Sequence, residues 1–224
     1  MFFCLRIDLD YVPWDTPDAT EFGHGEPAAL LRILDLARYT GFKFHFFVSN
    51  RVLRAFPANA EAALNDGHDL DWLCKHPEAA EARFHDARAL FSMIGHVPVG
   101  MAVRGAWPAN GEEFDGIEQL AFLSAAPGLV PKGLKLFPVE TRAAREATRA
   151  GMSARAWTDV TKTQLREAAS RNFGLTLIVR PQVLARFDPK LSHLKEILDF
   201  ARALDLPVQT LRDSLRSESS STKP

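Results

Sequence analysis

Two aspartates close the first apolar run of the chain, residues 2–10, which reads FFCLRIDLD. Alternate side chains of a strand share a face, so Arg6, Asp8 and Asp10 are predicted to point to the same side. Two carboxylates on one face are unfavourable unless a cation lies between them, and a metal ion or an arginine such as Arg6 or Arg104 would supply it. The structural alternative is a helix cap beside a surface aspartate. We favour a functional pair because the rest of the strand is apolar.

A second stretch, NDGHDLDWLCKHPE at residues 65–78, concentrates residue types that hold metal ions. It contains two histidines, three aspartates and one cysteine between an Asp-Gly turn and a proline. The alternative interpretation is a polar strand end whose histidines make ordinary hydrogen bonds. Of the two histidines, His76 is the stronger candidate for a ligand.

The elements that would position these residues alternate along the chain. Apolar runs predict strands at residues 2–9, 42–48, 99–105, 134–139, 175–179 and 207–211. Amphipathic spacing predicts helices at residues 26–41, 58–65, 78–94 and 191–204. Such alternation indicates βαβ units and a mainly parallel sheet, whose chemistry gathers where the strands end. The residues that follow these strands should therefore meet at one edge, among them Asp10, Asn50, His76, Arg104 and Arg180.

Composition limits the classes of function. The chain has 224 residues, 46% hydrophobic and 25% charged, with a net charge of −1. We expect one domain at residues 1–213 and a disordered polar tail at 214–224. The balanced charge argues against nucleic acid and anionic membranes as partners, and no apolar segment is long enough to span a bilayer. Two cysteines, a charged start and the absence of a signal-peptide pattern predict a reducing, cytoplasmic setting.

The order of several motifs resembles the polysaccharide deacetylases, carbohydrate esterase family 4. LRIDLDYVPW and GFKFHFFVSN look like the start of that family, in particular its branch that removes acyl or formyl groups from amino sugars. NDGHDL followed by HPE is similar to its histidine-containing element, VRGAW to its arginine loop, and ARALDLPVQTL to its end. The resemblance spans roughly residues 2–213. It implies a distorted (β/α) barrel with about seven parallel strands and hydrolysis of non-peptide carbon–nitrogen bonds in an N-acylated sugar or small amide.

The resemblance also implies roles for individual residues. In the family, one aspartate and two histidines hold zinc or another divalent metal, which acidifies a water molecule, while a second aspartate is the base. Carried over, Asp8 would be the base, Asp10 and His76 metal ligands, and Arg104 the residue that orients Asp8. Trp72 stands four residues before His76, where the family has its other metal-binding histidine, and a tryptophan cannot bind a metal.

A second departure concerns the proton donor. Arg180 stands where the family carries a late histidine, and a guanidinium can stabilise an anion but cannot donate and recover a proton at neutral pH. Cys74, His85 or His193 would have to replace a missing group, and none restores the spacing. We therefore expect weak or absent metal binding and doubtful hydrolase activity. The alternative is a catalytically inactive member that keeps the cleft to bind a sugar-like small molecule or a protein.

Aromatic side chains supply a further expectation, because their faces suit the rings of carbohydrates. Trp107, beside Arg104, is the strongest candidate for binding a carbohydrate ligand, and Trp72 is a second one. Core packing is the alternative for each. The sequence leaves the substrate and the oligomeric state open.

Overall fold

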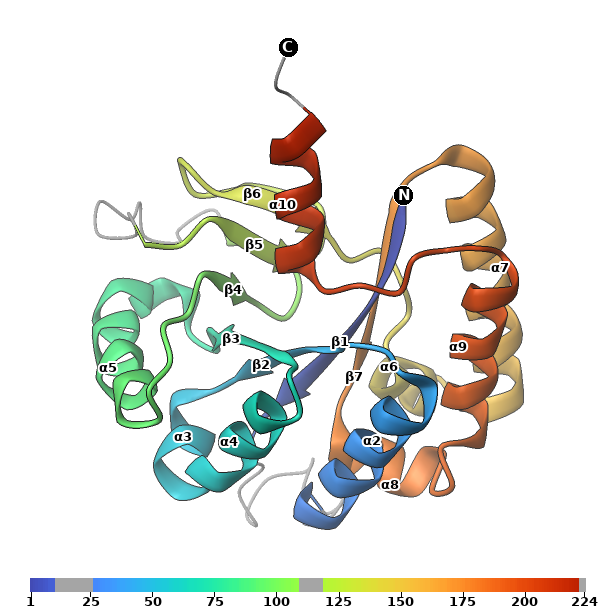
Figure 1. Ribbon diagram of the computed structural model, residues 1–224, viewed down its shortest axis with the longest axis horizontal. Helices are drawn as coiled ribbons and strands as arrows, with labels where there is room; N and C mark the ends of the chain where they lie inside the picture. Colours follow the sequence, from blue (N-terminus) through green and yellow to red (C-terminus); the bar gives the residue numbers. More distant parts are fainter. Residues whose placement is uncertain (11–25, 109–118, 222–224) are drawn as a thin grey trace.

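A computed structural model describes residues 1–10, 26–108 and 119–221, and it forms a strongly curved parallel sheet surrounded by helices (Figure 1). The sheet has seven strands in the order β6-β5-β4-β3-β2-β1-β7. Their bounds are β1 (Phe2–Leu9), β2 (His45–Val48), β3 (Asp69–Leu73), β4 (Gly100–Ala102), β5 (Phe122–Ala125), β6 (Lys135–Pro138) and β7 (Gly174–Val179). The two edge strands approach each other, and Thr141 Oγ1 donates to the carbonyl of Thr176 across the gap (2.7 Å). The predicted distorted (β/α) barrel is confirmed.

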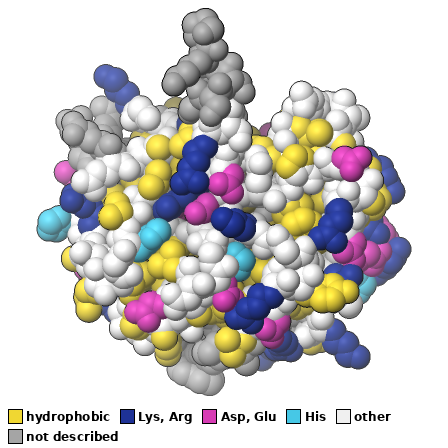
Figure 2. Space-filling view, viewed as in Figure 1, with side chains coloured by type: hydrophobic (Ala, Val, Ile, Leu, Met, Phe, Trp, Pro, Cys, Tyr) yellow, Lys and Arg dark blue, Asp and Glu magenta, His cyan; other side chains and the backbone are white. Residues whose placement is uncertain are grey.

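Most helices cover the outer face of the sheet, whereas the last one packs against the side chains inside the barrel. Their bounds are α2 (Glu26–Thr40), α3 (Asn50–Ala55), α4 (Pro57–Asn65), α5 (Ala80–Met93), α6 (Ala144–Arg149), α7 (Ala154–Arg171), α8 (Pro181–Phe187), α9 (Ser192–Ala203) and α10 (Leu211–Ser221), with a short 3-10 turn at Pro77–Ala79. In the described part of the chain, no helix is both long and apolar enough to cross a membrane. On the face shown in Figure 2, acidic, basic and apolar side chains are interspersed, as the near-neutral net charge suggests.

Strand β1 divides the core in the way its alternation predicts. Phe3, Leu5, Ile7 and Leu9 pack outward in the main core cluster, between the sheet and the helices. Phe2 and Cys4 belong to a second cluster inside the barrel, together with rings contributed by β2, β5 and β6. Arg6 and Asp8, on the same inward face, are fully buried. Along β1, the inward face thus changes from apolar side chains at its start to charged ones nearer its end.

The start of the strands is closed by a buried polar network. Asp71 accepts hydrogen bonds from the backbone amides of Val99 (2.7 Å) and Gly100 (2.9 Å), from Arg212 Nε (2.9 Å) and from His45 Nε2 (2.9 Å). The other ring nitrogen of His45, Nδ1, accepts from the backbone amide of Leu211, so Nε2 carries the proton that points to Asp71. Burial alone would raise the pKa of Asp71, but the hydrogen bonds from His45 and Arg212 hold it below its usual value.

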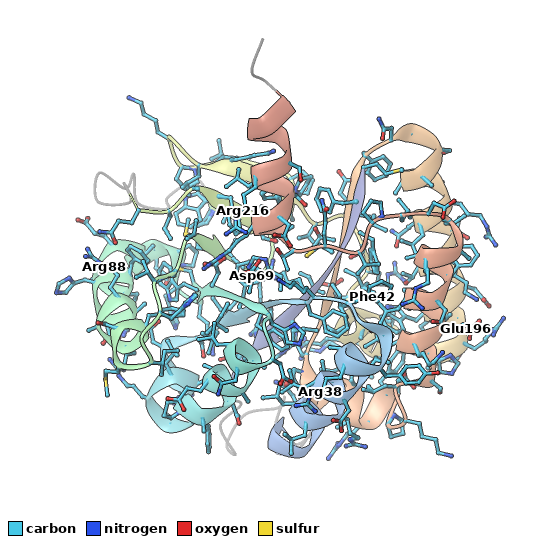
Figure 3. The ribbon with its side chains drawn as sticks, in the orientation of Figure 1. Arg38, Phe42, Asp69, Arg88, Glu196 and Arg216 are labelled. Carbon is cyan, nitrogen blue, oxygen red and sulfur yellow. The ribbon has the colours of Figure 1, made fainter. Side chains whose placement is uncertain are left out.

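Two of these contacts come from the segment around α10, which corrects the prediction for the end of the chain. Residues 214–221 are helical rather than disordered, and residues 222–224 lie outside the described part. Thr210 Oγ1 accepts from the backbone amide of Asp213, which caps the helix, and also donates to Asp69, labelled in Figure 3 near the base of α10. The predicted strand at 207–211 forms only a single bridge, between Phe3 and Val208.

Candidate functional site

Asp8 is neutralised from inside the barrel. Its side chain is fully buried, and Arg6 donates to both carboxylate oxygens, from Nε to Oδ1 (2.7 Å) and from Nη2 to Oδ2 (3.2 Å). The guanidinium is itself fixed by β5 and the end of β4, since it donates to the carbonyl of Ser124 (2.9 Å) and to that of Val103 (3.1 Å). Arg6 therefore acts as an internal counter-ion whose position depends on three strands.

Asp10 follows β1 and lies among cations from three other strand ends. Its Oδ2 is 2.9 Å from Arg104 Nη1, 3.1 Å from Lys75 Nζ and 3.9 Å from Arg180 Nη2, while Oδ1 accepts from Ser49 Oγ (3.1 Å). Burial alone would raise the pKa of Asp10, but the three cations outweigh it and hold the pKa below its usual value. Asp10 is thus a stable anion and a weak base.

Arg104 links the two aspartates. Its Nε approaches Asp8 Oδ2 at 3.5 Å while Nη1 binds Asp10. Arg6, Lys75, Arg104 and Arg180 are four cations around two carboxylates, so positive charge exceeds negative charge within this group of six side chains. The sequence predicts a metal ion or an arginine between the two aspartates. In the structure, Arg104 contacts both of them.

Arg180 precedes α8 and is 5% exposed. Burial, together with the nearby charge of Arg104, lowers its pKa to about 10. The group is therefore still a cation at neutral pH. Its predicted part in catalysis, the stabilisation of an anion, stays a prediction.

The histidines of the 65–78 stretch lie apart from the aspartates. The His76 side chain is 57% exposed, and its Nδ1 is 3.0 Å from Glu78 Oε1. His68 is buried, accepts from the backbone amide of Phe44 and stacks on its ring, so its role is structural. The two histidines therefore do not form a pair around Asp10.

The described side chains are a poor donor set for the metal centre that the resemblance implies. Within residues 1–10, 26–108 and 119–221, no three His, Cys, Asp or Glu side chains gather closely enough to hold a metal ion. Cys74 is buried in the outer core, and His85 is exposed on α5. A divalent ion at Asp10 would meet Arg104 and Lys75 at the same carboxylate oxygen. Weak or absent metal binding remains a prediction.

Trp72, which stands in place of a histidine, braces the wall of the site. The residue is 1% exposed, its Nε1 donates to Asn50 Oδ1 (2.7 Å), and its ring packs on Phe84. Asn50 in turn donates to Asp86 Oδ2 (2.8 Å) and to the carbonyl of Arg83 (2.9 Å). Trp72 thereby ties β3 to α3 and α5. Its predicted ligand contact, and that of Trp107, which is 5% exposed, stay predictions, although both indoles are largely covered by protein.

A cleft of about 610 Å³ opens beside Asp10, reached through Ser49 and Lys75. Its apolar wall comes from Ala55, Trp72 and Leu73. Its cationic or titratable lining comes from α3, the segment after β3 and α5, and consists of Arg51, Arg54, Lys75, His76 and Arg83. Among the described residues that line the cleft, none is acidic.

Four basic residues that line the cleft were missed by the sequence reasoning: Lys75, Arg51, Arg54 and Arg83. Lys75 directly precedes His76, and Arg51 directly follows Asn50, so both stand just after strands whose ends were expected to gather. Arg83 lies on a predicted helix, and only the packing of α5 beside α3 brings it to the cleft. A search for every charged residue after each strand, rather than for metal ligands alone, would have found the first two.

Solved structures share the fold of this chain. A protein described as a polysaccharide deacetylase from Mycobacterium smegmatis aligns with a TM-score of 0.74 and 14% identity, covering 99% of this chain and 91% of that one. The allantoinase PuuE aligns with a TM-score of 0.78 and 10% identity, covering 99% and 91%. A pseudoenzyme of the CE4 family from Bacillus anthracis aligns with a TM-score of 0.61 and 10% identity, covering 95% of this chain and 64% of that one.

These likenesses show that the chain has the polysaccharide deacetylase fold of carbohydrate esterase family 4. The resemblance inferred from the motif order is thus supported at the level of the fold. No protein-family model matches the sequence, and no curated protein matches it.

Proposed function

We propose that the protein binds a carbohydrate-like small molecule in the cleft beside Asp10 and does not hydrolyse it. The observation that carries this proposal is the ion-pair cluster in which Arg6, Arg104 and Lys75 occupy the oxygens of Asp8 and Asp10. In a deacetylase these two carboxylates would have to accept a proton and hold a metal. In this chain both are neutralised by its own side chains.

The cluster opposes each catalytic task in a definite way. A base must accept a proton, but Asp8, the aspartate in that role, accepts two hydrogen bonds from the buried guanidinium of Arg6. A divalent metal would have to displace Lys75 and Arg104 and then tolerate their charge nearby. Water without a metal keeps a pKa of about 15.7, against about 7 on a catalytic zinc, and a carboxylate is far too weak to make up the difference.

Protonation of the leaving amine is also hindered. Arg180 is a cation with a pKa of about 10, so it can stabilise an oxyanion but is a poor donor of the proton that an amine needs. Loss of general acid help typically costs about 10²–10⁴ in rate. The fold is compatible with an inactive member, since one protein of the same fold is described as a pseudoenzyme.

Hydrolysis of a non-peptide carbon–nitrogen bond is the second candidate. It is favoured by the convergence of Asp8, Asp10 and Arg104 where β1 and β4 end. Two proteins with this fold are also described as a deacetylase and an allantoinase. On this alternative, Arg104 would orient Asp8 as the base. A cytoplasmic location is part of either proposal.

The test combines turnover with binding. Release of free amine from N-acetylated amino sugars is measured for the wild type, Asp8→Asn and Trp72→His/Arg180→His, each with added zinc, and binding of the same sugars is measured by calorimetry. We expect no turnover by the wild type and measurable binding that Lys75→Ala weakens. Robust turnover by the wild type, absent from Asp8→Asn protein that is still folded, would establish the hydrolase instead.

A further inference from the structure

The cleft next to the aspartates has a cationic lining. Three arginines and a lysine reach it from three elements, Arg51 and Arg54 from α3, Lys75 from the segment after β3 and Arg83 from α5. We propose that its ligand is a sugar-sized molecule carrying an oxyanion, either a phosphate or a carboxylate. This inference rests on the proposed function only for the location of the ligand.

Two of the lining residues, Arg54 and His76, have acidic partners that stand outside the lining. Arg54 pairs with Asp86 on α5, and His76 pairs with Glu78, but neither of these carboxylates is among the residues that line the cleft. At the floor, Lys75 lies on Asp10 together with Arg104 and Arg180, where cations outnumber carboxylates. An incoming anion would therefore meet positive potential both at the rim and at the floor.

The frame that holds these cations is fixed by hydrogen bonds. Asn50, at the start of α3, accepts from Trp72 and donates to Asp86 and to the backbone of Arg83, so α3, β3 and α5 are locked together around the opening. Arg51 follows Asn50 directly, and the carbonyl of Arg83 is one of the bonded groups. Preorganisation of this kind lowers the entropic cost of binding.

The chemistry of the side chains selects the class of ligand. A guanidinium presents several N–H donors in a planar fork that matches the oxygens of a phosphate or a carboxylate, whereas an ammonium acts as a point charge. The cleft volume of about 610 Å³ falls within the range of small-molecule sites, about 300–1,000 Å³. Of the apolar lining residues, Ala55 is exposed while Trp72 and Leu73 are each 1% exposed, so the cleft offers little apolar surface to a carbon skeleton. A neutral sugar would leave the cations of the cleft to water.

The experiment compares four probes by isothermal titration calorimetry at low ionic strength: inorganic phosphate, glucose 6-phosphate, glucuronate and N-acetylglucosamine. The variants are Arg51→Ala, Arg83→Ala and Arg51→Lys. Arg88→Ala is the matched control, because Arg88 is exposed on the same helix as Arg83 (labelled in Figure 3) and does not line the cleft. All three substituted residues are exposed, so the four variants should fold.

We expect an anionic sugar to bind more tightly than N-acetylglucosamine and than inorganic phosphate alone. Arg51→Ala or Arg83→Ala should weaken that binding roughly tenfold or more, which is the loss expected for one charged hydrogen bond. Arg51→Lys should recover part of it, and Arg88→Ala should change nothing. The better of glucose 6-phosphate and glucuronate identifies the oxyanion.

Equal weakening by Arg88→Ala would mean that only the general charge of the protein matters, and preference for N-acetylglucosamine would mean that the ligand is neutral. Either result overturns the proposal, as does failure of both anionic sugars to bind. These outcomes are separate from the turnover assay, since a zinc-dependent hydrolase could still bind an anionic substrate, and a binding protein could still prefer a neutral one.

Discussion

The ammonium of Lys75 lies 3.1 Å from Oδ2 of Asp10, the same oxygen that Arg104 binds at 2.9 Å. In the deacetylases that the motifs resemble, the corresponding aspartate is a metal ligand. Two side-chain cations of this chain thus contact the carboxylate to which the resemblance assigns a metal. The consequences of these contacts can be measured.

Removal of Lys75 should raise the affinity of Asp10 and its surroundings for a divalent metal. In Lys75→Met, one of the cations on Asp10 is lost while the apolar stem is kept, so the affinity for zinc should rise relative to the wild type. Zinc content after dialysis, measured by atomic absorption, checks this. If the wild type already retained one zinc per chain, and Asp10→Ala released it, our description of the donor set would be wrong.

Removal of the Asp8 charge should destabilise the fold strongly. In Asp8→Asn, the buried guanidinium of Arg6 loses its ionised partner, and breaking a buried pair in this way costs about 3–5 kcal/mol. Asp35→Asn is the control, because its pair with Arg38 is exposed and such pairs contribute about 0–1 kcal/mol. Urea unfolding of both variants gives the comparison, and equal losses would contradict the role of burial.

Acid should lower the free energy of unfolding by protonating Asp71, at the end of the barrel where the strands start. The pKa of this carboxyl is lower in the folded protein than its unfolded value of about 3.9, so its contribution to stability is fully present above about pH 4 and is lost as the pH falls through the folded pKa. The free energy of unfolding should therefore decline below about pH 4 more steeply for the wild type than for Asp71→Asn. Parallel curves for the two proteins would show that other carboxylates dominate.

Substitution of Trp72 should separate its packing from its hydrogen bond. Trp72→Phe loses mainly the bond to Asn50 and should cost about 1 kcal/mol, plus part of the ring contact. Trp72→Ala leaves a cavity beside Phe84 and should cost about 3–5 kcal/mol. Thermal and urea unfolding measure both. Two small, similar losses would indicate that the indole is not a structural brace.

Several parts of the site could be predicted from sequence because they depend on local periodicity. The alternation of β1 places Arg6, Asp8 and Asp10 on one face whatever the rest of the chain does. The convergence of Arg104 and Arg180 on Asp10 follows from parallel strands ending at a common edge. These predictions needed only the period of a strand and the direction of the sheet.

Other parts depend on contacts between distant segments. Strand β3 was not among the predicted strands because two of its five residues are aspartates. The buried one, Asp71, is bound by His45, by Arg212 and by two backbone amides near β4, and the half-buried Asp69 is bound by Thr210. Strand β5 was also missed. Lys75 received no attention because a lysine beside a candidate metal ligand looks like a surface residue until its partner is known. Residues 214–221 of the last helix were taken for disorder because their composition is polar, and the contacts that dock this helix, from Thr210, Leu211 and Arg212, are tertiary.

The network around Asp71 has a consequence for the order in which the molecule can be completed. A chain growing from its amino end makes β1, β2 and β3 long before residues 210–212 exist, and until then Asp71 and His45 lack the donors that Arg212 and the amide of Leu211 supply. Water must serve these groups in the meantime. The end of the barrel that carries the cleft can therefore be assembled while the opposite end is still hydrated. Water leaves that opposite end only when the start of α10 packs against it.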